Sequence, residues 1–128
     1  MPDSSTVSVR YIVNDVDVAL PFYTDLLKFK IDMHPAPGFA MLSKGNLRLL
    51  LNKPSTGGGG QTIADSTVPS PGGWNRIQIE VDDLEEAIKK MQSMNAKFRN
   101  NLIDGIGGKQ ILLEDPSGNL VELFEAKR

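Results

Sequence analysis

Two regions of the chain alternate apolar and polar residues, and each is followed by a helical pattern. Residues 7–13 follow the period-two pattern of a half-buried strand. Asn14 or Asp15 then offers a helix N-cap, and apolar residues recur at helical spacing up to residue 29. Pro21 removes a backbone hydrogen bond in the second turn, so we expect a kink in this helix.

The same order of elements returns in the second half of the chain. Residues 76–81 alternate as a strand, and residues 82–86 resemble a capping box that opens a helix through about Met94. Turn residues separate three short apolar stretches after each helix. These stretches are 30–33, 39–42 and 47–51 in the first half, and 96–99, 110–114 and 120–125 in the second.

The two halves also match each other in residue type. Residues 13–20 match residues 81–88, and residues 45–51 match residues 118–124. A capping pattern and a Gly-Asn turn could recur by chance, but both matches fall at equivalent points of the element order, which favours a duplication.

We therefore predict an α+β fold of two tandem βαβββ modules that form a curved mixed sheet. The modules span residues 7–52 and 74–126 of a single domain. The segment 53–73 between them is rich in Gly and Pro, and we expect a flexible linker there.

Composition excludes several classes of function. The chain has 128 residues, no Cys, one His and a formal net charge of −2. Thiol chemistry and a His-rich metal cluster are therefore not expected within one chain. The sequence has no cluster of basic residues of the kind that is typical of nucleic-acid binding, and it has no apolar run long enough to span a membrane. The first residues lack the pattern of a secretory signal, so we expect a cytoplasmic protein.

Two motifs resemble the vicinal oxygen chelate superfamily, which includes glyoxalases, bleomycin resistance proteins and extradiol dioxygenases. One motif is VNDVDVALPFY at residues 13–23 with LLKF at 26–29, and the other is DPSGNLVEL at residues 115–123. Lys28 stands where the family usually has Gly, which affects the end of the helix. The resemblance implies the glyoxalase/bleomycin resistance fold, and it implies homodimers, which are common in the family.

The resemblance also implies four metal-ligand positions on the first and last strands of the modules. By motif alignment they fall at Ser8, Leu49, Arg76 and Glu122, of which Glu122 is the only plausible ligand. Leu49 has no donor atom, and Arg76 places a positive charge where the ion would lie. We therefore expect no metal cofactor, with a divalent metal as the alternative. Ile12 occupies the position of an Arg found in glutathione-dependent relatives, which argues against glutathione as a substrate.

His34, the only histidine, could be a metal ligand or a general base. It lies between Met33 and Pro35, where a strand gives way to a turn. We interpret it as a surface imidazole.

Strand alternation predicts a mixed ligand pocket. Arg76 and Glu122 could instead pair as a buried salt bridge that fills a vacated metal site. Trp74 could form an aromatic wall together with Phe39, or could anchor the end of the linker. The predicted ligand-binding residues are Arg10, Leu49, Trp74, Arg76, Gln78, Glu80, Glu122 and Phe124.

Three functions remain open at this point. The first is a binding protein for a small polar organic molecule, without the usual metal centre. The second is a metal-dependent glyoxalase-like lyase or isomerase, or a dioxygenase, with a non-standard site in which Glu122 is the best catalytic candidate. The third is an interaction module with no ligand. Bleomycin-type drug sequestration is less favoured, because a polycationic drug needs a strongly acidic groove.

Overall fold

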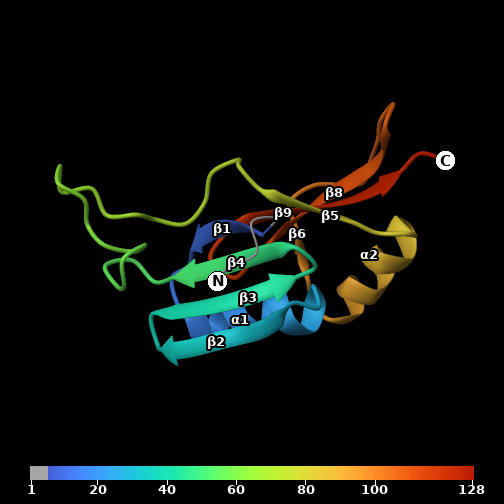
Figure 1. Cartoon of the computed structure of the whole chain (residues 1–128). Coiled ribbons are helices and arrows are strands. Elements are labelled where there is room, and N and C mark those ends of the chain that lie inside the picture. The colour runs from blue at the N-terminus through green and yellow to red at the C-terminus, as the bar shows by residue number, and fades with distance from the viewer. Residues whose placement is uncertain (1–5) are drawn as a thin grey trace. The chain divides into compact units, whose positions relative to one another are not determined.

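The computed structural model describes residues 6–128 and divides the chain into two compact units between Gly72 and Gly73 (Figure 1). Within its described residues, 6–72, the first unit contains one helical segment and four strands. Its elements are β1 (Val7–Ile12), α1 (Val16–Pro21), a π-helical turn (Phe22–Leu26), β2 (Lys30–Ala36), β3 (Phe39–Lys44) and β4 (Leu47–Asn52).

The second unit contains one helix and five strands. Its elements are β5 (Ile77–Glu80), α2 (Leu84–Ser93), β6 (Lys97–Phe98), β7 (Ile103–Asp104), β8 (Gly108–Glu114) and β9 (Leu120–Ala126). The short strand β7, which pairs with β8, was not predicted from the sequence.

In each unit the first strand pairs with the last strand and lies at one edge of the sheet. The strand order is β1-β4-β3-β2 in the first sheet and β5-β9-β8-β6 in the second. The pairs β1–β4 and β5–β9 are parallel, whereas β2–β3, β3–β4, β6–β8 and β8–β9 are antiparallel. The predicted α+β fold of two βαβββ modules is confirmed.

The two helices begin as the sequence predicts. The side chain of Asp15 accepts a hydrogen bond from the Val18 N–H, and that of Asp83 accepts one from the Glu86 N–H. The first helix does not break at Pro21 but continues as the π-helical turn, in which the Leu27 N–H donates to the Phe22 carbonyl.

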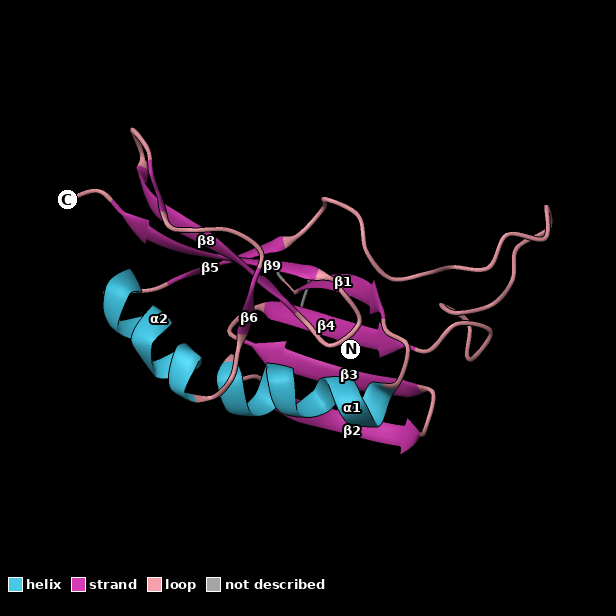
Figure 2. Cartoon of the chain, turned by 180° about the vertical axis from the view of Figure 1, so that it is seen from behind, coloured by secondary structure: helices cyan, strands magenta, loops and turns pink. Residues whose placement is uncertain are grey.

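The helix α1 covers one face of the first sheet (Figure 2). The buried apolar side chains of the first unit lie on this face. Tyr23 is fully buried there, and its ring meets Tyr11 and Phe29 edge to face. The strand residues of this core are Tyr11, Ala40, Leu42, Leu49 and Leu51.

Leu49 was predicted to share a face with Arg10, and this prediction is wrong. In the parallel register Leu49 lies opposite Val9, and Arg10 lies opposite Leu50. Directly opposed residues point to the same face, so Leu49 belongs to the core, where its exposed fraction is 0%. The motif alignment misses this because β4 and β9 differ by one residue in their register to the first strand of each unit.

Candidate functional site

The second sheet has a polar face, which we define as the face that carries Gln78 on β5 and Glu122 on β9. These two residues lie directly opposite each other, and Glu80 lies opposite Phe124 on the same face. Strand alternation therefore brings four of the predicted ligand-binding residues together, as expected from the sequence. The opposite face holds the core residues Ile111, Leu113, Val121 and Leu123.

Arg76 and Glu122 form the ion pair that the sequence left open. The Arg76 Nη2 lies 2.8 Å from the Glu122 Oε1, and the Arg76 Nε donates to the same oxygen at 3.0 Å. The Gln78 Nε2 donates to the other oxygen, Oε2, at 2.6 Å. The side chain of Glu122 is only 9% exposed and that of Arg76 is 28% exposed, so the pair is largely shielded from water.

This arrangement does not fit a metal centre. Both oxygens of Glu122 already accept hydrogen bonds, and the groups that surround them are a guanidinium and an amide nitrogen, which are donors. A divalent ion would have to displace a cation from a buried carboxylate. Within residues 6–128 no three His, Asp or Glu side chains are grouped so that they could hold a metal ion.

Trp74 lies at the start of this unit and contacts two arginines. Its carbonyl accepts a hydrogen bond from the Arg76 Nη1 at 3.2 Å, and the Cζ of Arg99 lies 5.3 Å from the centroid of its indole ring. The ring is within the range of a cation–π contact and yet 63% of Trp74 is exposed.

Arg99 was not predicted from the sequence as a site residue. It follows β6, and its N–H donates to the Leu112 carbonyl, so it continues the pairing of Lys97 with Glu114 and Phe98 with Leu113. Leu112 in turn lies opposite Glu122, which places Arg99 on the polar face. The alternation of residues 96–99 could have indicated the face, but not the contact with a tryptophan 25 positions earlier.

Arg10 lies in the first unit, on the face of β1 that also carries Ser8. Its guanidinium packs against Gly59, where any side chain would collide with it. The first part of the predicted linker therefore lies against a predicted ligand-binding residue.

Residues 53–60 form a hydrogen-bonded loop. The Gly60 N–H donates to the Thr56 carbonyl at 3.0 Å, and the Thr56 Oγ1 donates to the carbonyls of Lys53 at 2.7 Å and Gly38 at 3.2 Å. The loop is thus tied to the turn between β2 and β3. Its glycines allow close backbone approach, because a side chain at Gly60 would meet the carbonyls of Lys53 and Thr56.

His34 lies on the exposed strand β2, which agrees with its interpretation as a surface imidazole. Its Nε2 lies 2.9 Å from the Asp17 Oδ1, and its Nδ1 lies 2.8 Å from the Phe39 carbonyl oxygen. Both neighbours are acceptors, so they favour the doubly protonated ring. The hydrogen bond to Asp17, followed by that to Phe39, raises the pKa of His34.

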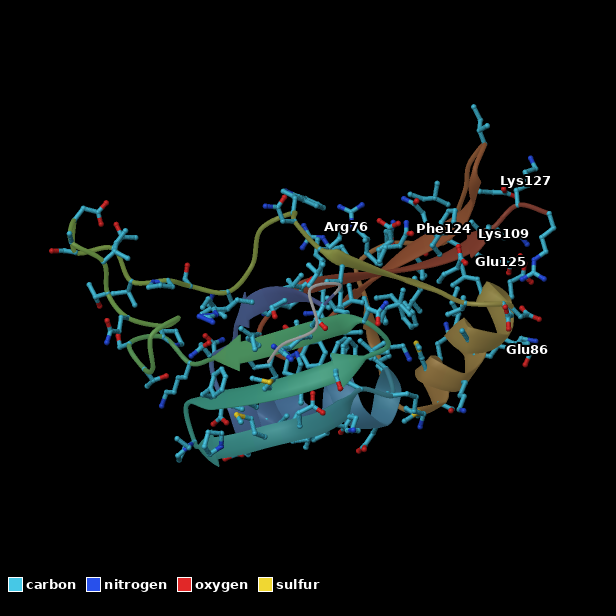
Figure 3. All side chains as sticks on the ribbon, in the orientation of Figure 1. Arg76, Glu86, Lys109, Phe124, Glu125 and Lys127 are labelled. Atoms are coloured by element: carbon cyan, nitrogen blue, oxygen red, sulfur yellow. The ribbon has the colours of Figure 1, made fainter. Side chains whose placement is uncertain are left out.

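A cavity of about 260 Å³ lies where β8 begins and β9 ends. It is lined by Asp104, Gly108 and Lys109 on one side and by residues 125–128 on the other. Figure 3 shows Lys109, Glu125 and Lys127 there, away from Arg76. Three of its charged side chains have partners: Lys109 pairs with Glu85 at 3.1 Å, Arg128 pairs with Asp82 at 3.5 Å, and Glu125 accepts a hydrogen bond from the Leu84 N–H. None of the predicted site residues lines this cavity.

Within the described part of the chain no helix is long and apolar enough to cross a membrane.

Comparisons with known proteins agree with the geometry. The model of the Glyoxalase/Bleomycin resistance protein/Dioxygenase superfamily matches residues 6–123. No curated protein matches the sequence.

Solved structures of this fold cover nearly the whole chain. A superfamily member from Sphaerobacter thermophilus is 26% identical with a TM-score of 0.73, and the match covers 94% of this chain and 95% of that one. A lactoylglutathione lyase from Agrobacterium tumefaciens is 20% identical with a TM-score of 0.72 (98% and 96% covered). TnmS3, an antibiotic binding protein from Streptomyces sp. CB03234, is 19% identical with a TM-score of 0.72 (99% of both chains).

Proposed function

The chain belongs to the Glyoxalase/Bleomycin resistance protein/Dioxygenase superfamily, and on this premise we propose that it binds a small polar organic molecule without the metal centre of its catalytic relatives. The ligand contacts the polar face of the second sheet through Arg76, Gln78, Glu80 and Phe124, with Trp74 beside them.

The observation that supports this proposal is the ion pair of Arg76 with Glu122. Glu122 is the one residue at a family ligand position with a suitable donor atom, and its two oxygens are held by Arg76 and Gln78. Removing such a partner from a buried carboxylate strongly destabilises the folded protein, because the charge is left uncompensated. The cluster therefore serves as a fixed polar floor, on which the outer N–H groups of Arg76 and the free oxygen of Gln78 orient a ligand.

The alternative is a glyoxalase-like lyase or isomerase, or a dioxygenase, with a non-standard metal site. The similarity to a lactoylglutathione lyase is at 20% identity, which supports a common fold and does not carry over the reaction. We also propose a homodimer, which sedimentation analysis of the full chain would test.

The first experiment is elemental analysis of tag-free protein purified without chelator and then reloaded separately with Mn, Fe, Ni and Zn. We expect no stoichiometric metal. About one metal per chain, lost in Glu122→Gln but kept in Glu80→Gln, would overturn the proposal and favour the enzyme. Glu80 is the matched control because it is a carboxylate of the same face outside the ion pair.

The second experiment is a thermal-stability screen against small polar compounds. A compound that binds only the folded protein raises the melting temperature by mass action. We expect at least one class of compound to do so, and to lose its effect in Arg76→Gln. If no class stabilises the protein, the binding function is wrong and the interaction module remains.

A further inference from the structure

We infer that the ligand is a planar aromatic carboxylate that stacks on the indole of Trp74 and pairs with Arg99 and Arg76. This inference rests on the proposed function and adds to it a class of ligand and a residue, Arg99, that the sequence did not indicate.

The first step is the exposure of Trp74. Tryptophan is the largest apolar side chain, and here 63% of it faces solvent although it lies beside a polar cluster. Gly72 and Gly73 precede it with φ values of +107° and +95°, a backbone conformation that side-chain-bearing residues rarely adopt. The backbone conformation of these two glycines thus sets the direction of the chain at Trp74. A flat ligand on the ring would bury apolar surface that the folded protein leaves in water.

The second step is the local charge. Arg76 is balanced by Glu122, and Lys97 on the same face as Arg99 is paired with Glu114 at 3.9 Å. Among the residues that the structure describes, Arg99 has no carboxylate partner, and its guanidinium contacts the Trp74 ring. The guanidinium that contacts the indole is therefore a positive charge without a carboxylate partner, which favours an anionic ligand.

The third step is the supply of hydrogen-bond donors. A guanidinium has five N–H groups, and Arg76 uses its Nε and one group each of Nη2 and Nη1 for Glu122 and the Trp74 carbonyl. One N–H on each Nη has no partner among the described residues, and both are available to donate to a carboxylate. The whole fork of Arg99 is also available once a ligand ring takes its place on the indole.

Together, the exposed indole, the charge of Arg99 and the available N–H groups favour a planar anion over other ligands. A cation would be repelled by the guanidinium of Arg99, which no carboxylate of the described residues balances. A neutral aromatic molecule would stack on the ring without using Arg99, and an aliphatic carboxylate would use the arginines without the ring.

The experiment uses the fluorescence of the full chain, because Trp74 is its only tryptophan. The probes are benzoate, benzamide and cyclohexanecarboxylate, with excitation beyond the absorption of benzoate. We expect a saturable change with benzoate, and about tenfold weaker binding of each of the other two. The change is expected to weaken about tenfold in Arg99→Gln and to be unaffected in Lys97→Gln, which removes a paired cation from the same face.

Circular dichroism and melting of Arg99→Gln establish that the variant folds, and calorimetry with Trp74→Leu tests the stacking independently of fluorescence. Equal binding of benzoate and benzamide, no binding of benzoate, or full benzoate binding by Arg99→Gln would overturn the inference. The thermal screen separates this failure from that of the proposed function. A hit among neutral or cationic compounds that depends on Arg76 but not on Arg99 rejects the aromatic carboxylate and keeps the binding function.

Discussion

The two βαβββ units repeat each other on one face of the sheet and differ on the other. On the helix side, Tyr11 lies opposite Leu51 in the first unit, and Ile79 lies opposite Leu123 in the second. On the other side, the corresponding pairs are Arg10 with Leu50 and Gln78 with Glu122. Duplicated modules thus keep the side chains that build the core, where volume is tightly constrained. The other face is free to diverge, and among the described residues only the second unit has a largely shielded ion pair on it.

The largest effect on stability is expected from alanine substitutions on the two opposite faces of β4. Leu49→Ala should lower the free energy of unfolding by about 3 kcal/mol, because it leaves a cavity in the core, whereas half-buried Leu50→Ala should cost about 1 kcal/mol. Urea denaturation measures both. Equal costs would show that the two sides of β4 are not distinguished as described.

The next effect tests the ion pair. Glu122→Leu should cost about 2 kcal/mol, because Arg76 loses its partner but can still reach water with a side chain that is 28% exposed. The double variant Arg76→Leu with Glu122→Leu should recover most of this loss, since it leaves no unpaired charge. If the single variant is as stable as the wild type, the cluster does not hold the polar face together.

A smaller effect is expected in the loop 53–60. Gly60→Ala should cost roughly 1–2 kcal/mol, because a Cβ there meets two backbone carbonyls. Gly58→Ala should change stability by less than about 0.5 kcal/mol, since nothing lies near a Cβ at that position. Two neutral substitutions would mean that the glycine run is not held in the loop.

The smallest effect concerns the exposed ion pair of the first unit. Asp17 and the Phe39 carbonyl raise the pKa of His34 in the folded protein. The protonated ring therefore stabilises the fold fully at pH values below the pKa of His34 in the unfolded chain, and this stabilisation is lost as the pH rises through the pKa of His34 in the folded protein. We expect less than about 1 kcal/mol, as for other exposed pairs. His34→Gln should remove this pH dependence. An NMR titration of the single histidine should give a lower pKa in Asp17→Asn, and an unchanged pKa would contradict the pairing.

Local signals predicted much of the fold. Asp15 and Asp83 cap helices through contacts three residues along the chain, and this spacing is visible in the sequence. The alternation of β5 and β9 placed Gln78 and Glu122 on one face, because a period of two needs no tertiary information. The two-residue strand β7 had too few positions to show such a period.

The remaining features depend on distant contacts. A difference of one residue in register moved Leu49 from the predicted site into the core, and nothing within β4 reveals it. Thr56 donates to the Gly38 carbonyl, and the composition of residues 53–73 does not reveal this contact between distant residues. Arg99 reaches Trp74 across a sheet whose strand order is not written in the order of the chain.

The parallel pairing of first and last strands also sets the order in which each unit can form. Val7 and Leu47 pair across 40 positions of the chain, and Ile77 and Val121 across 44, whereas the hairpins β3–β4 and β8–β9 join neighbouring strands. Closing a long loop has a high entropy cost, so we expect the hairpins to form first and the first strand to dock last. Substitutions in β1 or β5 should then accelerate unfolding more than they slow folding.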